Sequence, residues 1–180
     1  MNRELYLCSL LMLAVFAGMI WYLADYVSSN QEALFNNSYN SQQRVLAQEN
    51  TRGTIYAGTG EVLAQTVIAE DGTSVREYPY KNIFAHVVGY TDKGKTGIEE
   101  LENYQLIHSD ISDREKLDHE LAGEKNPGND VYTTLDTSLQ QAASDALGLY
   151  RGAIVVTEIK TGRVLAMVSK PDYDPNKIAE

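Results

Sequence analysis

A group of residues in the middle of the chain has the types and spacing of a phosphate-binding loop. They are Gly89, Gly94, Lys95 and Thr96, in the pattern G-x-x-x-x-G-K-[ST]. In such a loop, backbone amides and the lysine ammonium hold the phosphates of a nucleotide at the start of a helix. Glu99 and Glu100 fall in the first turn of the helix expected here, and their charge would repel phosphate. We therefore interpret the match as a glycine-rich surface turn, and P-loop nucleotide binding stays an alternative.

Acylation of an active serine is the second chemistry that the sequence suggests. The triplet Lys-Thr-Gly occurs at residues 95–97 and 160–162, and Ser28-Ser29-Asn30 has the form Ser-x-Asn. Penicillin-recognising serine enzymes use these motifs together with a Ser-x-x-Lys, whose lysine activates the serine. No serine in this chain has a lysine three residues later. We assign no catalytic residue, and we expect these 180 residues to be inactive alone.

The remaining titratable residues do not form a metal-binding or cofactor-binding pattern. The three histidines, which share no ligand spacing, are His86, His108 and His119. Asp110, Asp113 and Asp118 lack the alternate spacing and central glycine of a calcium loop. We therefore expect no metal and no cofactor.

The composition excludes further classes of function. The chain has 15 Lys and Arg against 25 Asp and Glu, which gives a formal net charge of −10 and a pI near 4.7. So acidic a chain would repel a phosphate backbone, so nucleic acid is not an expected partner. The single cysteine, Cys8, allows neither an intrachain disulfide nor a cysteine-based zinc site.

An apolar segment near the N-terminus has the length of a membrane span. Leu5 to Leu23 contains no Asp, Glu, Lys, Arg or His, and Trp21 and Tyr22 lie near its end, where aromatic rings favour the interface. As a helix these 19 residues would be about 28 Å long, close to the hydrocarbon thickness. We predict that residues 1–24 form a cytoplasmic tail and a transmembrane anchor.

The cations flanking this segment predict its orientation. Arg3 and the terminal amine precede it, whereas no Lys or Arg follows it until Arg44. The positive-inside rule then places the N-terminus in the cytoplasm and the bulk of the chain outside. A cleaved signal peptide is the alternative, but no small-x-small site follows Leu23.

The part beyond the anchor has a polar beginning and then a mixed pattern. Residues 28–50 are rich in Asn, Gln and Ser, with a helical interruption at 32–35, and we predict a stalk. Residues 52–80 predict a small β-meander with turns at Gly58-Thr59-Gly60 and Asp71-Gly72. Residues 97–108 and 112–122 predict two helices, the second opened by a capping box of Ser112 and Glu115.

The last third of the chain predicts a strand, a helix and a β-hairpin. We expect a strand at 129–135, a helix at 137–150 capped by Asp136 or Thr137, and strands at 152–159 and 164–169. The two hairpin strands are apolar on both faces, as in strands that lie inside a larger sheet. We infer that the chain either belongs to a longer protein or needs a partner to cover the hairpin.

Several short motifs follow one another along the chain. They are Arg52-Gly53-Thr54-Ile55-Tyr56, Gly60-Glu61-Val62-Leu63-Ala64, Tyr78-Pro79, His86-Val87-Val88-Gly89-Tyr90, Gly94 with Gly97-Ile98-Glu99, Gly128-Asn129-Asp130-Val131, Thr134-Leu135-Asp136, Leu139-Gln140, Gly152-Ala153-Ile154-Val155-Val156 and residues 161–169. Taken in this order, they resemble the N-terminal part of class B penicillin-binding proteins, the bitopic D,D-transpeptidases of bacterial cell-wall synthesis. Their order and spacing are more specific than any single motif. The loop that mimics a P-loop lies inside this pattern.

The resemblance implies an α+β fold and a division of the chain into three parts. Residues 1–24 would be the anchor, residues 25–127 a stalk and pedestal domain, and residues 128–180 the start of an incomplete transpeptidase domain with its first helix and hairpin. The catalytic serine would lie beyond Glu180.

The resemblance also implies partners and a reaction. An active serine would attack the D-Ala-D-Ala end of a peptidoglycan stem peptide and pass the acyl group to an amine, and β-lactams would acylate the same serine. Partners would be the membrane and a polytopic SEDS-type glycosyltransferase. A membrane-anchored interaction protein without enzymatic activity remains an alternative from another class.

Overall fold

The structure is a computed structural model that describes residues 3–36, 42–69 and 73–178. The chain divides into two compact units, Met1–Asn40 and Ser41–Glu180. The predicted turn at Asp71-Gly72 lies outside the described residues. The mixture of helices and short sheets confirms the predicted α+β class.

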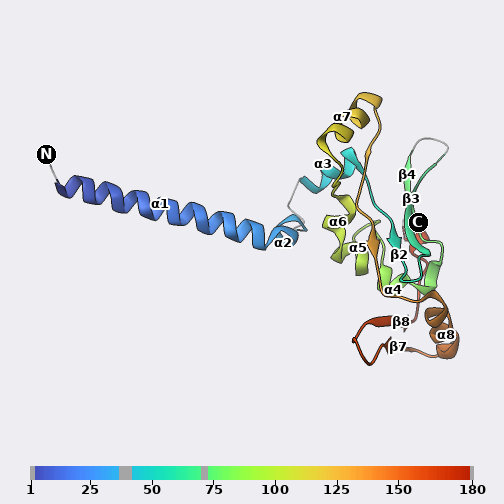
Figure 1. The fold of residues 1–180 in the computed structure, drawn as a ribbon. Coiled ribbons are helices and arrows are strands. Elements are labelled where there is room, and N and C mark those ends of the chain that lie inside the picture. The colour runs from blue at the N-terminus through green and yellow to red at the C-terminus, as the bar shows by residue number, and fades with distance from the viewer. Residues whose placement is uncertain (1–2, 37–41, 70–72, 179–180) are drawn as a thin grey trace. The chain divides into compact units, whose positions relative to one another are not determined.

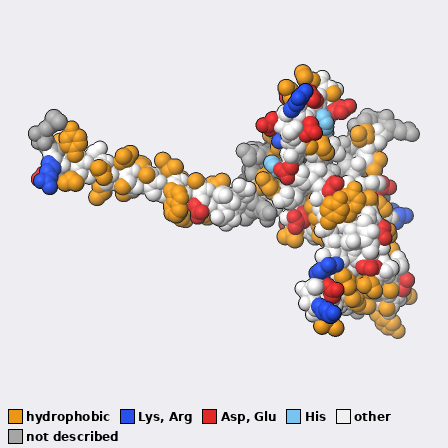
Figure 2. All heavy atoms as spheres, in the orientation of Figure 1, with side chains coloured by type: hydrophobic (Ala, Val, Ile, Leu, Met, Phe, Trp, Pro, Cys, Tyr) orange, Lys and Arg blue, Asp and Glu red, His pale blue; other side chains and the backbone are white. Residues whose placement is uncertain are grey.

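The first unit consists of a long helix, α1 (Arg3–Ser29), and a short one, α2 (Gln31–Phe35). By length and composition α1 can cross a membrane, and none of its side chains is buried. Figure 2 shows it covered by hydrophobic side chains. The helix continues past Asp25, since no proline interrupts it before Ser29. The predicted helical interruption at 32–35 corresponds to α2.

The second unit begins with a helix that the sequence did not predict, α3 (Gln42–Glu49), in what we expected to be a stalk. A four-stranded sheet follows in the order β4-β3-β2-β6, made by β2 (Ile55–Tyr56), β3 (Val62–Ile68), β4 (Ser74–Glu77) and β6 (Val131–Tyr132). β3 pairs antiparallel with β2 and with β4, as the predicted meander requires. β6 has two residues where we expected a strand of seven, and it pairs in parallel with β2.

A second, very small sheet joins β1 (Asn50–Thr51) and β5 (Asn126–Pro127) in parallel. Five helices follow β4 and precede β5 along the chain: η1 (Lys81–Ile83), α4 (Ala85–Val88), α5 (Gly97–Leu101), α6 (Asn103–Ile107) and α7 (Asp113–Ala122). The single helix predicted at 97–108 is therefore two helices, which meet at Glu102 (φ −96°, ψ 19°). The capping box of α7 is present, with Ser112 and Glu115 bonded reciprocally.

The core of this unit lies between the four-stranded sheet and the helices α4 and α6. Fully buried side chains from the strands meet fully buried side chains from the helices there; they include Ile55, Leu63, Ala64, Val88 and Leu106. Leu63 and Ala64 are consecutive on β3, so this strand is covered on both of its faces near its start.

The C-terminal part of the unit is α8 (Thr137–Leu147), β7 (Gly152–Thr157), β8 (Val164–Lys170) and η2 (Pro175–Lys177). The helix is capped by Asp136, whose side chain accepts hydrogen bonds from the amides of Ser138 and Leu139. It packs beside the antiparallel β7–β8 hairpin (Figure 1). Within the described residues, β7 and β8 form a sheet of two strands only.

Candidate functional site

One carboxylate in the second unit is completely buried, and it binds two arginines. Glu99, in the first turn of α5, has no exposed surface. Arg52 Nε lies 2.6 Å from its Oε2 atom, and Arg76 Nε lies 2.8 Å from its Oε1 atom. The hydroxyl of Tyr78 donates a third, longer hydrogen bond to Oε1 (3.3 Å). We call these four residues the Glu99 cluster.

Further hydrogen bonds fix both guanidinium groups. Arg52 donates from Nη2 to the backbone oxygen of Glu99 (2.6 Å) and from Nη1 to Asn103 Oδ1 (2.8 Å). Arg76 donates from Nη1 to the oxygen of Gly53 (2.7 Å) and to Thr66 Oγ1 (3.1 Å). The cluster therefore ties β4 and the end of β1 to α5.

Glycines allow the backbone to approach closely around this cluster. A Cβ atom on Gly53 would lie 2.0 Å from the backbone oxygen of Asn129, and one on Gly89 would lie 1.8 Å from that of Thr96. Gly89 also has a φ of +84°, a conformation that favours glycine. These contacts explain why the motifs around Arg52 and Glu99 contain glycine.

Electrostatically, the cluster holds two positive charges against one negative charge in a buried place. Burial is the main cause that lowers the pKa of Arg52, and the neighbouring charge of Arg76 lowers it further, against the opposing effect of Glu99. Burial, and then the negative charge of Glu99, raise the pKa of Tyr78, so its hydroxyl stays protonated and can donate. Removing one partner from such a buried group typically lowers the free energy of unfolding by about 3–5 kcal/mol.

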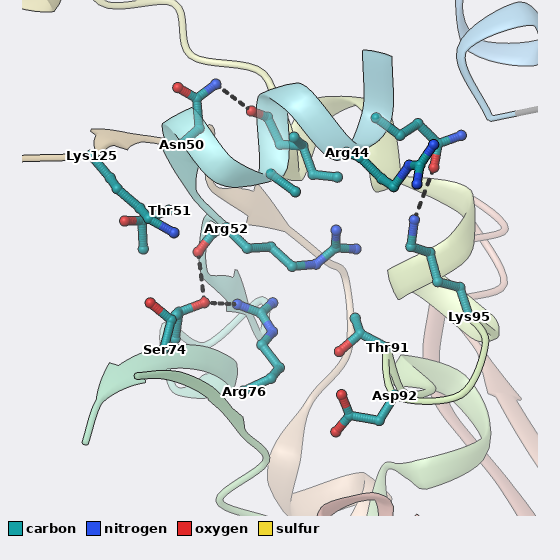
Figure 3. Close-up of a pocket in the computed structure, with 14 residues that line it drawn as sticks. Arg44, Asn50, Thr51, Arg52, Ser74, Arg76, Thr91, Asp92, Lys95 and Lys125 are labelled. Atoms are coloured by element: carbon teal, nitrogen blue, oxygen red, sulfur yellow. Dashed lines mark hydrogen bonds between the residues drawn. The ribbon is translucent and has the colours of Figure 1, made fainter. Parts of the chain in front are cut away.

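A cavity of about 340 Å³ opens beside the cluster. The basic residues that line it come from α3, β4 and three connecting segments; they are Arg44, Arg52, Arg76, Lys95 and Lys125. Figure 3 shows the guanidinium groups of Arg52 and Arg76 in the middle of this cavity. Lys95 reaches across to α3 and donates to Gln43 Oε1 (3.1 Å). Burial, and then the charge of Arg52, lower the pKa of Lys95.

The residues that resemble a P-loop do not form a phosphate cradle. Gly89 packs against Thr96, and the helix that follows, α5, has five residues. Its first turn presents the carboxylate of Glu99, and the two arginines already occupy that carboxylate. The geometry therefore favours the interpretation of this loop as a structural turn.

The other motifs from the sequence lie apart from this cavity. The triplet at residues 160–162 forms part of the turn between β7 and β8, where the hydroxyl of Thr161 bonds to Glu158. His86 contacts the backbone oxygen of Pro171 (2.9 Å), and His108 lies 3.3 Å from Asp110. Among the described residues, no three His, Cys, Asp or Glu side chains gather as a metal site.

Sequence reasoning missed three of the five basic residues of the cavity. Arg44, Arg76 and Lys125 belong to none of the motifs quoted above. Arg76 is 23 residues from its partner Glu99, so no local spacing connects them. Arg76 is the one position of β4 that is not exposed, and no pattern in the sequence marks it.

The comparisons with known proteins address the same region. Residues 52–131, which begin at Arg52 and contain the whole Glu99 cluster, match the family described as the penicillin binding protein A dimerisation domain. The chain is 41% identical over 150 residues to the peptidoglycan D,D-transpeptidase PbpA of Mycolicibacterium smegmatis, and the match covers 76% of this chain. It is 34% identical over 138 residues to the peptidoglycan D,D-transpeptidase MrdA of Escherichia coli K12.

The chain belongs to the class B penicillin-binding proteins. It spans about a third or less of the relatives that it matches: 30% of PbpA and 22% of MrdA. The match to MrdA covers 58% of this chain.

Solved structures of penicillin-binding proteins share the fold. A ceftriaxone acyl-enzyme complex of penicillin-binding protein A from M. tuberculosis superposes with a TM-score of 0.64 at 35% identity, covering 75% of this chain and 32% of that one. The D,D-transpeptidase domain of a peptidoglycan glycosyltransferase from Eggerthella lenta gives 0.60 at 41% identity, covering 73% and 28%. The family resemblance inferred from the motifs is therefore confirmed.

Proposed function

We propose that this penicillin-binding protein chain supplies the membrane anchor and the pedestal of a peptidoglycan D,D-transpeptidase. The match of residues 52–131 to the dimerisation-domain family carries this proposal, because that range coincides with the sheet and the Glu99 cluster. In this view residues 25–127 form the stalk and pedestal and residues 128–180 begin the transpeptidase domain.

The reaction proposed for the whole protein is acyl transfer through a serine. The serine attacks the carbonyl carbon of the penultimate D-Ala of a stem peptide, and D-Ala leaves with a proton on its amine. An amine of a second stem peptide then attacks the ester and regenerates the serine. Since no serine of this chain has a lysine three residues later, we propose that the nucleophile lies outside residues 1–180.

Labelling with a fluorescent penicillin tests whether the nucleophile lies outside residues 1–180. We expect no covalent label on the purified 180-residue chain in detergent, whereas PbpA of M. smegmatis serves as the labelled positive control. A penicillin-dependent covalent label on this chain, detected after denaturing electrophoresis, would show that it acts as an enzyme by itself.

The proposed topology has the N-terminus in the cytoplasm and a single membrane span, α1. The placement of Arg3 before the span and the lack of Lys or Arg until Arg44 support it. In a Cys8→Ser background, Lys160→Cys should react with a membrane-impermeant maleimide in intact cells, because the hairpin turn would lie outside. Asn2→Cys should react only after the cells are opened, and the reverse pattern would contradict the topology.

A polytopic SEDS-type glycosyltransferase is the proposed membrane partner. A single-span anchor with an extracytoplasmic pedestal suits a partner whose own helices lie in the same membrane. Co-expression with an epitope-tagged glycosyltransferase of this type from the same genome should give co-purification in detergent. Deleting residues 1–24 should weaken the association, and an unrelated polytopic protein serves as the negative partner.

A further inference from the structure

The cavity beside the Glu99 cluster is unusual because it concentrates positive charge in an acidic protein. The whole chain has a formal net charge of −10, yet five cationic side chains line this one cavity. The carboxylates that oppose them are Asp92, which also lines the cavity, and Glu99 behind Arg52 and Arg76. The local balance is therefore positive. We call this space the basic cavity.

One donor on a residue that lines the basic cavity is buried without a partner. The side chain of Arg76 is only 5% exposed, and its Nη2 atom makes no hydrogen bond within the described part of the chain. Its other two nitrogens are bonded to Glu99, Gly53 and Thr66. A buried guanidinium nitrogen without an acceptor is costly, and its positive charge has no hydrogen-bonded partner on that side.

The cations reach the cavity from opposite sides. Arg44 and Lys95 lie on one side of the two central arginines in Figure 3, and Lys125 lies on the other. Burial, and then the charge of Arg52, lower the pKa of Lys95, against the opposing effects of Glu99 and Glu100. An occupant with oxygen acceptors pointing in several directions would meet all of these groups.

We propose that the basic cavity binds a phosphoryl group. A phosphate monoester carries up to two negative charges, and a pyrophosphate can carry more. Their acceptor oxygens have a tetrahedral arrangement around each phosphorus, which suits arginines and lysines on several sides. A carboxylate is planar and singly charged, and one arginine can satisfy it. The volume of about 340 Å³ exceeds that of a single phosphate and leaves room for the group to which it is attached.

This site differs from the P-loop alternative and from the proposed pedestal role. It shares Lys95 with the P-loop pattern, but its other cations come from α3, β4 and the segments next to β1 and β5, and it does not use the amides at the start of α5. The phosphoryl group can come from a soluble phosphate compound or from the headgroup of a phospholipid. Both sources present the same chemistry to the cavity, and the experiment separates them.

The test uses the full chain in nanodiscs of neutral phosphatidylcholine, with inorganic pyrophosphate as the titrant in calorimetry. We expect saturable binding of one pyrophosphate per chain, with an affinity that falls as salt rises because the outer cations are exposed. Nanodiscs that contain phosphatidylglycerol should abolish the pyrophosphate signal if the lipid headgroup is the natural occupant. They should leave it unchanged if the occupant is soluble.

The variant Arg44→Gln/Lys125→Gln should weaken pyrophosphate binding about tenfold, since it removes two charge-assisted contacts. Both residues lie outside the Glu99 cluster and are exposed, so the thermal midpoint should not change. The matched control is Arg114→Gln/Lys160→Gln, which removes the same charges from exposed positions that do not line the cavity.

Three results would overturn the proposal. They are the absence of saturable pyrophosphate binding at concentrations up to about 1 mM, an equal loss of affinity in the control variant, and succinate binding as tight as pyrophosphate binding. The last result would assign the cavity to carboxylates.

Discussion

Two buried polar side chains organise two regions of the second unit in different ways. Glu99 ties β4 and the end of β1 to α5 through ion pairs. Gln140, on α8, ties the C-terminal hairpin to the rest of the unit through a neutral amide. Its Nε2 atom donates to the backbone oxygens of Ile83 and Met167 (both 2.8 Å), and its Oε1 atom accepts from the amide of Met167 (2.8 Å).

The difference between the two side chains concerns charge balance. Gln140 is fully buried, and both its donor and its acceptor groups are used, so the region around it has little electrostatic potential to offer a ligand. Glu99 is equally buried but faces two arginines, so its region keeps a positive surplus. The neutral amide serves packing alone, whereas the ionic cluster both supports the fold and leaves a charged cavity.

The largest effect is expected from Glu99→Ala. Without the carboxylate, Arg52 and Arg76 lie close together and largely buried with no counter-charge, so the free energy of unfolding should fall by about 3–5 kcal/mol. Urea denaturation of the chain in detergent, followed by circular dichroism, measures this. Glu100→Ala on the same helix is the control. Because Glu100 is exposed, this substitution should change the free energy of unfolding by less than about 0.5 kcal/mol. Equal losses of stability in the two variants would show that the buried ion pairs of Glu99 do not stabilise this region.

The second effect tests the neutral side of the comparison. Gln140→Ala leaves one buried amide and two carbonyl oxygens without their partner, so it should cost about 1–3 kcal/mol, less than Glu99→Ala. Gln141→Ala, at the exposed neighbouring position, removes only a bond to Asp145 and serves as the control. If Gln140→Ala is the more damaging of the two buried substitutions, charge is not the main difference between the regions.

The sequence predicted well those elements whose cause is local. The apolar run of α1, the capping box of Ser112 and Glu115, and the cap of α8 at Asp136 all depend on residues a few positions apart. The β7–β8 hairpin likewise follows from two apolar runs around a tight turn. These features needed no knowledge of distant parts of the chain.

Elements that depend on distant partners were missed or misjudged. α3 has few apolar residues, and the end of the segment is held in place by long-range bonds, such as that from Asn50 Nδ2 to the oxygen of Ile107 (2.8 Å). β6 is short because its pairing with β2 extends over two residues only. The family motifs contained Glu99 and Gln140, but neither their burial nor their partners could be predicted from spacing.

A third prediction concerns the cap that positions Gln140 on α8. Hydrogen bonds from the Ser138 hydroxyl and the Leu139 amide lower the pKa of Asp136. Because the folded-state pKa is the lower one, the cap stabilises the helix above about pH 4 and loses this effect as the pH falls through the folded-state pKa. Amide exchange at Ser138 and Leu139, corrected for intrinsic rates, should therefore become less protected in acid.

Asp136→Asn provides the control for this acid effect. Asparagine is also a good N-cap but does not titrate, so protection of the two amides should vary less with pH in this variant. A variant with the same acid dependence as the unsubstituted chain would assign the effect to another group.

The smallest effect is expected on the outer face of the hairpin, where the C-terminal region differs most from the Glu99 region. Val155 is 53% exposed on β7, whereas Val168 on β8 is 4% exposed. Val155→Thr keeps a β-branched side chain in a strand, so the free energy of unfolding should change by less than about 0.5 kcal/mol. Val168→Thr places a hydroxyl in a buried site and should cost about 1–3 kcal/mol.

The same pair of variants also distinguishes a packed face from an available one. An exposed apolar strand face favours contact with other surfaces, so Val155→Thr should reduce self-association of the chain in detergent, measured by sedimentation velocity, without reducing its stability. Val168→Thr should reduce the stability of the chain without reducing its self-association. If Val155→Thr proves as destabilising as Val168→Thr, the outer face of the hairpin is covered within the chain itself, and the two regions are packed alike.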